Sequence, residues 1–199
     1  MTRCRVVKAS FLHRRGWINM RGYFGIGVEG ISKEQNIGTV ARSAHAFGAS
    51  FFFTIAPVVD VGAFRASDTS DAFDHVPYHQ YSSVETLDLP DKCQLVAVEL
   101  VEDSIELPSF RHPTRAAYVL GPEMGSVSPE LMAKADHVIK IPMKFCVNVG
   151  VAGALVMYDR ALSMGKFAPR PVRAGGPTES LPERQTSLRR KVRNPQKYK

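Results

Sequence analysis

The chain has 199 residues, 44% of them hydrophobic, which is enough to bury the core of one globular domain. No apolar run reaches the roughly 18 residues that a membrane-spanning helix needs, and the first twenty residues lack the apolar stretch of a secretory signal. The three cysteines are widely spaced and form no C-x-x-C pair, which argues against a disulfide framework or a zinc site and favours a cytoplasmic protein.

The net charge of +7 is unevenly distributed along the chain. Residues 1–21 contain six basic and no acidic side chains, and residues 170–199 contain nine basic and two acidic ones. The segment 22–169 has 11 basic and 17 acidic side chains, so the body is mildly acidic. Basic ends on an acidic body suit a polyanionic partner such as RNA, although basic tails also arise where they only aid solubility.

The first third of the chain predicts two strands separated by a helix. The apolar run at 23–28 is typical of a central parallel strand, which is buried on both faces. Apolar and small side chains recur at helical spacing from 32 to 47, and Gly48 suits the helix end. The segment 50–55, with three consecutive phenylalanines, predicts a second strand in the core.

The later segments continue this alternation. Ser128 followed by Pro129 predicts the N-cap and first position of a short helix, and 147–166 predicts the last helix. Strands that alternate with helices indicate an α/β domain with a mainly parallel sheet flanked by helices. Further strands are predicted at 94–99, 116–120 and 137–141.

Composition divides the chain into three parts. Residues 1–21 form a basic N-terminal extension, and we hypothesise that 1–19 is dispensable because it shows no periodicity before Met20. Residues 22–168 form the α/β domain. Proline and glycine recur in 169–199, which predicts a basic tail that is disordered without a partner.

Two patterns are weaker than they look. Gly25, Gly27 and Gly30 fit G-x-G-x-x-G, but the first two lie within a predicted strand, whereas a dinucleotide-binding turn would place them after it. The six histidines show no metal-ligand spacing, so the sequence predicts no metal site, and His45 is interpreted as a surface or pocket residue of the helix.

Three segments that combine glycine, proline and polar residues carry the functional signal. They are N-I-G-T-V-A-R at 36–42, L-G-P-E-M-G at 120–125, and I-P-M at 141–143 followed by Asn148. In their order and spacing they resemble the three motifs of the TrmH-like (SpoU) RNA 2′-O-ribose methyltransferases of the SPOUT superfamily. The resemblance runs from about Gly25 to Arg160. It implies a homodimer and a SPOUT-type fold with a C-terminal trefoil knot. Ordinary folding rules disfavour such a knot.

By this resemblance, Arg42 helps to deprotonate the ribose 2′-hydroxyl, and Asn36 completes the first motif. An arginine is normally a poor base, so a nearby phosphate, desolvation or stabilisation of the developing alkoxide must assist it. Asn36 and Arg42 are about 1.7 helical turns apart and so do not share a helical face. We therefore expect Asn36 in the strand–helix loop, where it orients Arg42 or the substrate, and Arg42 beside the cofactor pocket of the partner subunit.

The other two motifs are expected to bind S-adenosylmethionine and to complete the catalytic site. By resemblance, backbone groups near Gly121, Ile141 and Val147, with Met143, hold the cofactor in a bent shape. Glu123 and Asn148 match the catalytic glutamate and asparagine of motifs two and three; a charge beside a helix N-terminus is the structural alternative for Glu123. The chain departs from the family at Cys146, which replaces a serine in a shortened loop and puts any role of that hydroxyl in doubt.

The resemblance implies transfer of a methyl group from S-adenosylmethionine to a ribose 2′-hydroxyl of RNA. Small stand-alone members of the family often act on tRNA, so tRNA is favoured over rRNA. Two alternatives stay open: a SPOUT-type methyltransferase that modifies an RNA base, and a non-catalytic RNA-binding protein that retains the fold, for which Cys146 is the main support.

Overall fold

The computed structural model describes residues 22–61, 72–165, 167, 170–171 and 174–176. The described residues between 22 and 165 belong to one compact unit. The hypotheses for the 1–21 extension and for 177–199 of the tail lie outside the described residues. The few described residues after 166 are in neither helix nor strand.

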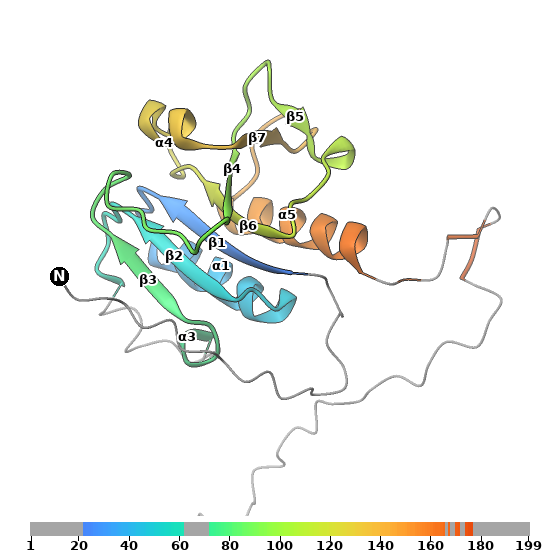
Figure 1. Cartoon of the computed structure of the whole chain (residues 1–199), viewed down its shortest axis with the longest axis horizontal. Coiled ribbons are helices and arrows are strands. Elements are labelled where there is room, and N and C mark those ends of the chain that lie inside the picture. The colour runs from blue at the N-terminus through green and yellow to red at the C-terminus, as the bar shows by residue number, and fades with distance from the viewer. Residues whose placement is uncertain (1–21, 62–71, 166, 168–169, 172–173, 177–199) are drawn as a thin grey trace, which may run out of the picture. The chain divides into compact units, whose positions relative to one another are not determined.

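All strand pairs within the described residues are parallel, and they join seven strands into one sheet in the order β3-β2-β1-β6-β4-β7-β5 (Figure 1). This confirms the predicted α/β class. The elements are β1 (Tyr23–Glu29), α1 (Glu34–Phe47), β2 (Phe51–Ile55), α3 (Ala72–His75), β3 (Tyr78–Tyr81), β4 (Gln94–Val98), β5 (Ile105–Glu106), the 3-10 turn η1 (Leu107–Ser109), β6 (Arg115–Leu120), α4 (Pro129–Lys134), β7 (His137–Lys140) and α5 (Val149–Met164).

The predicted strands and helices are confirmed, with small shifts at their ends. Gly48 ends α1 in the left-handed conformation (φ 75°), as the sequence predicted. The hydroxyl of Ser128 accepts a hydrogen bond from the backbone N of Leu131, so it caps α4. The last helix begins at Val149 rather than at 147, because Asn148 is its N-cap. The trefoil knot stays a prediction.

Each face of the sheet has its own hydrophobic core. On one face, α1 and α5 pack together over side chains that include Ile26, Phe52 and Tyr118. On the other face, α4 and the segment before β4 cover side chains that include Phe53 and Val119. Adjacent residues of one strand, such as Phe52 and Phe53, thus enter opposite cores, which is why the central strands are apolar at most positions.

The glycines of the G-x-G-x-x-G pattern serve packing within the sheet. Gly25 and Gly27 lie in β1, opposite Phe51 and Phe53 of β2, and the two phenyl rings occupy the space where side chains at these glycines would project. A Cβ at Gly27 would lie 2.5 Å from Cε2 of Phe53. The interpretation of this pattern as a strand feature is therefore confirmed.

Replacing Gly27 with alanine should destabilise the fold by about 1–3 kcal/mol, because the added methyl group overpacks a closed core. Gly153 of α5 provides the control. A Cβ there would lie 3.4 Å from the nearest side-chain atom, so Gly153→Ala should be neutral or stabilising. Urea unfolding of both variants measures the difference. Equal stabilities would show that the Phe53 ring yields easily.

Candidate functional site

A cleft of about 370 Å³ lies where the loops after β4, β6 and β7 meet the N-terminal ends of α1 and α5. Ligands of parallel α/β sheets bind at this carboxyl edge of the strands. The structure thus brings the three motif segments together, although they are far apart in the sequence. The predicted site residues that line the cleft are Asn36, Gly121, Glu123, Ile141, Met143, Val147 and Asn148.

Glu123 holds the beginning of α1. Its Oε2 accepts hydrogen bonds from the backbone N (3.0 Å) and the Oγ (2.8 Å) of Ser32. Its Oε1 accepts from the backbone N of Lys33 (3.2 Å) and from Nδ2 of Asn36 (2.7 Å). Lys33 is the N-cap residue of α1, and its side chain makes no capping bond. A glutamate about 90 residues away therefore supplies the acceptor for donors at this helix end.

These contacts also fix the charge of Glu123. Burial raises the pKa of its carboxyl, but hydrogen bonds from Asn36, from its own backbone and from Ser32 outweigh burial and lower the pKa from 4.5 to about 2. The group is consequently ionised at neutral pH, with both oxygens engaged. Such a carboxylate is suited to positioning neighbouring groups and is a poor proton acceptor.

Asn36 joins Glu123 to the third motif. Besides donating to Glu123, it accepts through Oδ1 a hydrogen bond from Nδ2 of Asn148 at 2.8 Å. Asn148 in turn caps α5 by accepting from the backbone N of Gly150 at 2.8 Å. Asn36 is 6% exposed and lies in the first turn of α1, so the prediction that it occupies the strand–helix loop is wrong. The helix begins at Glu34, close to the start that the helical spacing from 32 to 47 predicted, so Asn36 lies inside it.

Arg42 does not lie with the other predicted residues. It is exposed on α1 and does not line the cleft of its own chain. Among the described residues it makes no hydrogen bond or ion pair. Its separation from Asn36 on the helix, expected from the sequence, places it on a different face of α1.

Cys146 lines the cleft and is an exposed, free thiol. It occupies the short loop between Met143 and Asn148, whose side chains also line the cleft. No group of three or more His, Cys, Asp or Glu side chains in the described part of the chain is placed to hold a metal ion. Nor does any helix described there have the length and hydrophobicity to cross a membrane.

Sequence reasoning missed some residues of the cleft. Lys33 and Glu99 both line it. The carboxylate of Glu99 accepts hydrogen bonds from the backbone N of Leu100 (2.8 Å) and of Val127 (2.6 Å), so it ties the loop after β4 to the loop after β6. The position of Glu99 at the end of a predicted strand was an available signal, but the Val127 contact depends on tertiary structure.

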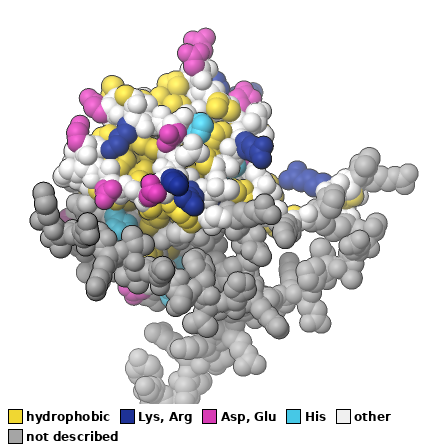
Figure 2. Space-filling view, viewed as in Figure 1, with side chains coloured by type: hydrophobic (Ala, Val, Ile, Leu, Met, Phe, Trp, Pro, Cys, Tyr) yellow, Lys and Arg dark blue, Asp and Glu magenta, His cyan; other side chains and the backbone are white. Residues whose placement is uncertain are grey.

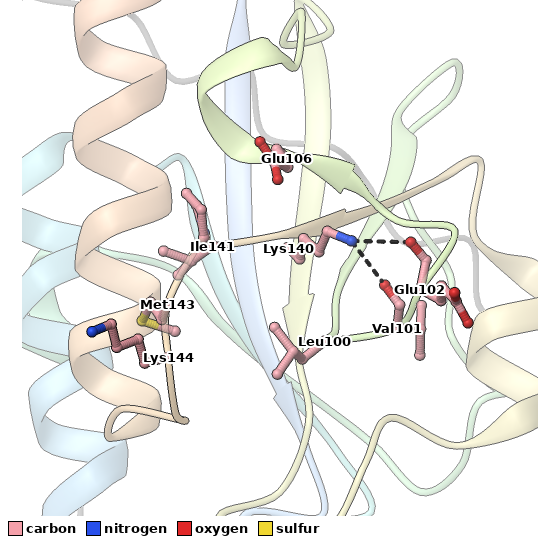
Figure 3. Close-up of a pocket in the computed structure, with 9 residues that line it drawn as sticks. Leu100, Val101, Glu102, Glu106, Lys140, Ile141, Met143 and Lys144 are labelled. Atoms are coloured by element: carbon pink, nitrogen blue, oxygen red, sulfur yellow. Dashed lines mark hydrogen bonds between the residues drawn. The ribbon is translucent and has the colours of Figure 1, made fainter.

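A second, open groove of about 510 Å³ continues from the cleft (Figure 3). Lys140 crosses it: Nζ donates to the backbone carbonyl oxygens of Glu102 (3.0 Å) and Val101 (3.4 Å), which fastens the loop after β4. The residues shared by the groove and the cleft are Leu100, Lys140, Ile141 and Met143.

Residues 24–158 match the model of the SpoU rRNA Methylase family, which covers more than half of the chain and all three motifs. The chain belongs to this family. The suspected resemblance is thereby confirmed. No curated protein matches the chain.

Solved structures show the same fold. The SpoU methyltransferase AviRb from Streptomyces viridochromogenes is 23% identical, with a TM-score of 0.61 over 74% of this chain and 62% of AviRb. A protein from a structural study of the 2-OH methylation of C/U34 on tRNA is 24% identical, with a TM-score of 0.58 over 71% of this chain and 91% of its own. The TrmH/SpoU tRNA modifying enzyme of A. aeolicus is 20% identical, with a TM-score of 0.57 over 72% of this chain and 76% of the enzyme.

The SpoU domain described here spans about three fifths of the length of AviRb. AviRb has also been solved in complex with AdoMet, the methyl donor that SpoU methyltransferases use. At these identities the solved structures establish a common fold, and the family model identifies the SpoU segment.

Proposed function

We propose that this SpoU protein transfers a methyl group from S-adenosylmethionine to a ribose 2′-hydroxyl of RNA. One observation carries the proposal: the three motif segments meet in a single cleft, where Glu123, Asn36 and Asn148 form one hydrogen-bonded network. The network fixes the starts of α1 and α5 and the loop after β6 relative to one another. A preorganised site of this kind is what group transfer requires.

The cleft suits S-adenosylmethionine in size and lining. Its volume of about 370 Å³ is within the range of small-molecule sites. Side chains such as Leu100, Ile141 and Met143 give it apolar walls for an adenosine, and Gly121 leaves the backbone after β6 accessible. Gly121, Ile141, Met143 and Val147 would hold the cofactor, which supplies an electrophilic methyl group when bound.

Arg42 would act on the ribose hydroxyl from a neighbouring subunit. Because it does not line its own cleft, a second chain offers the simplest way to place it beside a cofactor. The described surface has a face for such a chain: Val151, Leu155 and Tyr158 of α5 are 47%, 38% and 51% exposed and recur at helical spacing. This apolar stripe supports a homodimer, in which the Arg42 guanidinium stabilises the developing alkoxide.

One comparison favours tRNA over rRNA as the substrate. The two neighbours reported above that are named for tRNA match this chain over 91% and 76% of their own length, whereas the match covers 58% of the rRNA methyltransferase from Sinorhizobium meliloti. With either RNA, the basic ends of the chain would add phosphate contacts that the mildly acidic body lacks.

Methyl transfer from labelled S-adenosylmethionine to total tRNA and, separately, to rRNA tests the proposal. We expect incorporation into tRNA, and alkali-resistant dinucleotides in the digested product, because a 2′-O-methyl group blocks cleavage at its own ribose. Label in alkali-sensitive nucleotides would instead identify a base methyltransferase. RNA binding without incorporation into either pool would favour the non-catalytic alternative.

A further inference from the structure

Two large apolar side chains stand exposed on the loops at the mouth of the cleft. Phe145 is 77% exposed and immediately precedes Cys146, which lines the cleft. Met124 is 89% exposed and immediately follows the lining residue Glu123. A singly exposed apolar side chain is ordinary, so these two carry an argument only together with the cleft and the cations beside them. We call these two residues, with Lys33 and Lys144, the rim.

Phe145 is held in place from both sides. Met143, two residues before it, and Val147, two residues after it, both pack against the hydrophobic core. Asn148 is fixed by its hydrogen bonds to Asn36 and to the backbone N of Gly150. The loop between these anchors is short, so the ring is exposed on a constrained backbone and loses little conformational entropy when it binds a partner.

Three carboxylates at this edge of the sheet are engaged by backbone N–H groups of neighbouring segments. Glu29 accepts from the backbone N of Ser128 (2.8 Å), Glu99 accepts from the backbone N of Val127 (2.6 Å), and Glu123 binds the start of α1. On the face drawn in Figure 2, acidic and basic side chains are interspersed. A polyanion that contacts the cleft would pair with the cations that border it.

Lys33 and Lys144 are such cations. Within the described residues neither forms an ion pair, and Lys33 lines the cleft at the start of α1. In Figure 3 the amine of Lys144 points away from Glu102 and Glu106, which lie on the far side of the groove. The lysine side of the cleft is therefore the one that suits a phosphate backbone.

We infer that the rim binds a single-stranded segment of the substrate RNA, with Phe145 stacked on a nucleobase, Met124 packed beside it, and Lys33 and Lys144 on the flanking phosphates. Aromatic rings interleaved with cations are typical of single-strand recognition, and bases within an A-form duplex are not accessible for stacking. The inference rests on the proposed function, because the rim borders the cleft assigned to the methyl donor. It identifies the substrate as an unpaired region of RNA.

The test compares full-length Phe145→Ala and Phe145→Trp with the unmodified protein. The probe is a 12-nucleotide single-stranded RNA that contains 2-aminopurine, whose fluorescence falls when the base stacks. We expect Phe145→Ala to weaken RNA binding about tenfold and to lose the quenching, and Phe145→Trp to retain both. Ile105→Ala, which removes an exposed apolar side chain from β5, is the control and should leave RNA affinity unchanged. S-adenosylmethionine affinity, measured by calorimetry, should be equal in all four proteins.

Unchanged RNA affinity in Phe145→Ala would overturn the inference. So would sedimentation showing that this variant alone loses its dimer, because Phe145 would then belong to a subunit interface. Failure of the proposed function is distinguishable. If RNA binding depends on Phe145 but no RNA pool accepts methyl groups, the inference about the rim is supported and the proposed activity is refuted. If methyl transfer proceeds with the same KM for RNA in Phe145→Ala, the proposed activity is supported and the inference about the rim is refuted.

Discussion

Replacing Arg42 with alanine should lower the rate of methyl transfer by a factor of about 10²–10³, while S-adenosylmethionine still binds. Cofactor binding should persist because Arg42 lies outside the cleft of its own chain, so its loss leaves the residues that line the cleft intact. A donor aimed at a developing oxyanion contributes to the transition state and little to the ground state, so kcat should fall rather than KM rise. Single-turnover transfer to tRNA and calorimetric titration with S-adenosylmethionine measure the two effects separately.

Arg42→Lys is the control, because it keeps the charge and loses the planar guanidinium. Partial activity in this variant would assign the effect to electrostatic stabilisation. Full activity in Arg42→Ala would contradict the assigned role altogether. Loss of cofactor binding in Arg42→Ala would show that the residue supports the cleft instead.

Mixed dimers test whether Arg42 acts across the subunit interface. The second variant is Gly121→Val, whose side chain would crowd the loop after β6, since a Cβ at Gly121 would lie 2.9 Å from the backbone N of Val127. Each variant alone should be inactive. Random exchange of subunits between the two variants should restore about a quarter of the activity of the unmodified protein. Half of the dimers are then mixed, and each mixed dimer has one complete site out of two. No recovery would place Arg42 in the site of its own chain.

The central strands of the fold were predictable because their physical requirements are local. Strands β1, β2, β4 and β6 are buried on both faces, so each appears in the sequence as a continuous apolar run. Strands β3 and β5 lie at the two edges of the sheet and are largely polar or exposed, so no run indicated them. Their pairing with β2 and β7 comes from the sheet itself.

The residues of the site could be predicted from the sequence, but the contacts between them could not. The motifs named Asn36, Glu123 and Asn148, yet the hydrogen bonds that join them span 87 and 112 positions and follow from no spacing rule. The hydroxyl of Ser32 donates to Glu123, a contact that no local pattern indicates. The start of α1 agreed with the predicted helix to within two residues, but Asn36, which was expected in the strand–helix loop, lies in its first turn.

Replacing Glu123 with alanine should destabilise the fold by about 2 kcal/mol, because several donors at the start of α1 lose their acceptor. For a domain of this size, that corresponds to a fall in Tm of about 4–8 °C. Methyl transfer should fall as well, since Asn36 loses the contact that orients it toward Asn148. Thermal unfolding and the tRNA assay measure the two consequences.

Glu130→Ala is the control that separates the hydrogen bonds accepted by Glu123 from a general effect of charge. Glu130 is an exposed glutamate in the first turn of α4, so it shares the charge and the position near a helix N-terminus. Its loss should cost about half a kcal/mol or less. Equal losses in the two variants would mean that Glu123 acts only as a charge near a helix end.

Stability contributed by Glu123 should depend on acidity in a defined window. Its folded-state pKa of about 2 lies below the usual value of 4.5, so the contribution is fully present above about pH 4.5 and is lost as the pH falls toward 2. A glutamine at this position has no ionisable group. Its NH2 group is a donor and would face the donors of Ser32 or Asn36 without accepting their hydrogen bonds. The difference in unfolding free energy between the unmodified protein and Glu123→Gln should therefore be largest at neutral pH and shrink at pH 4, 3.5 and 3. A difference that stays constant across this series would show that packing, rather than the ionised carboxylate, fastens α1 to the loop after β6.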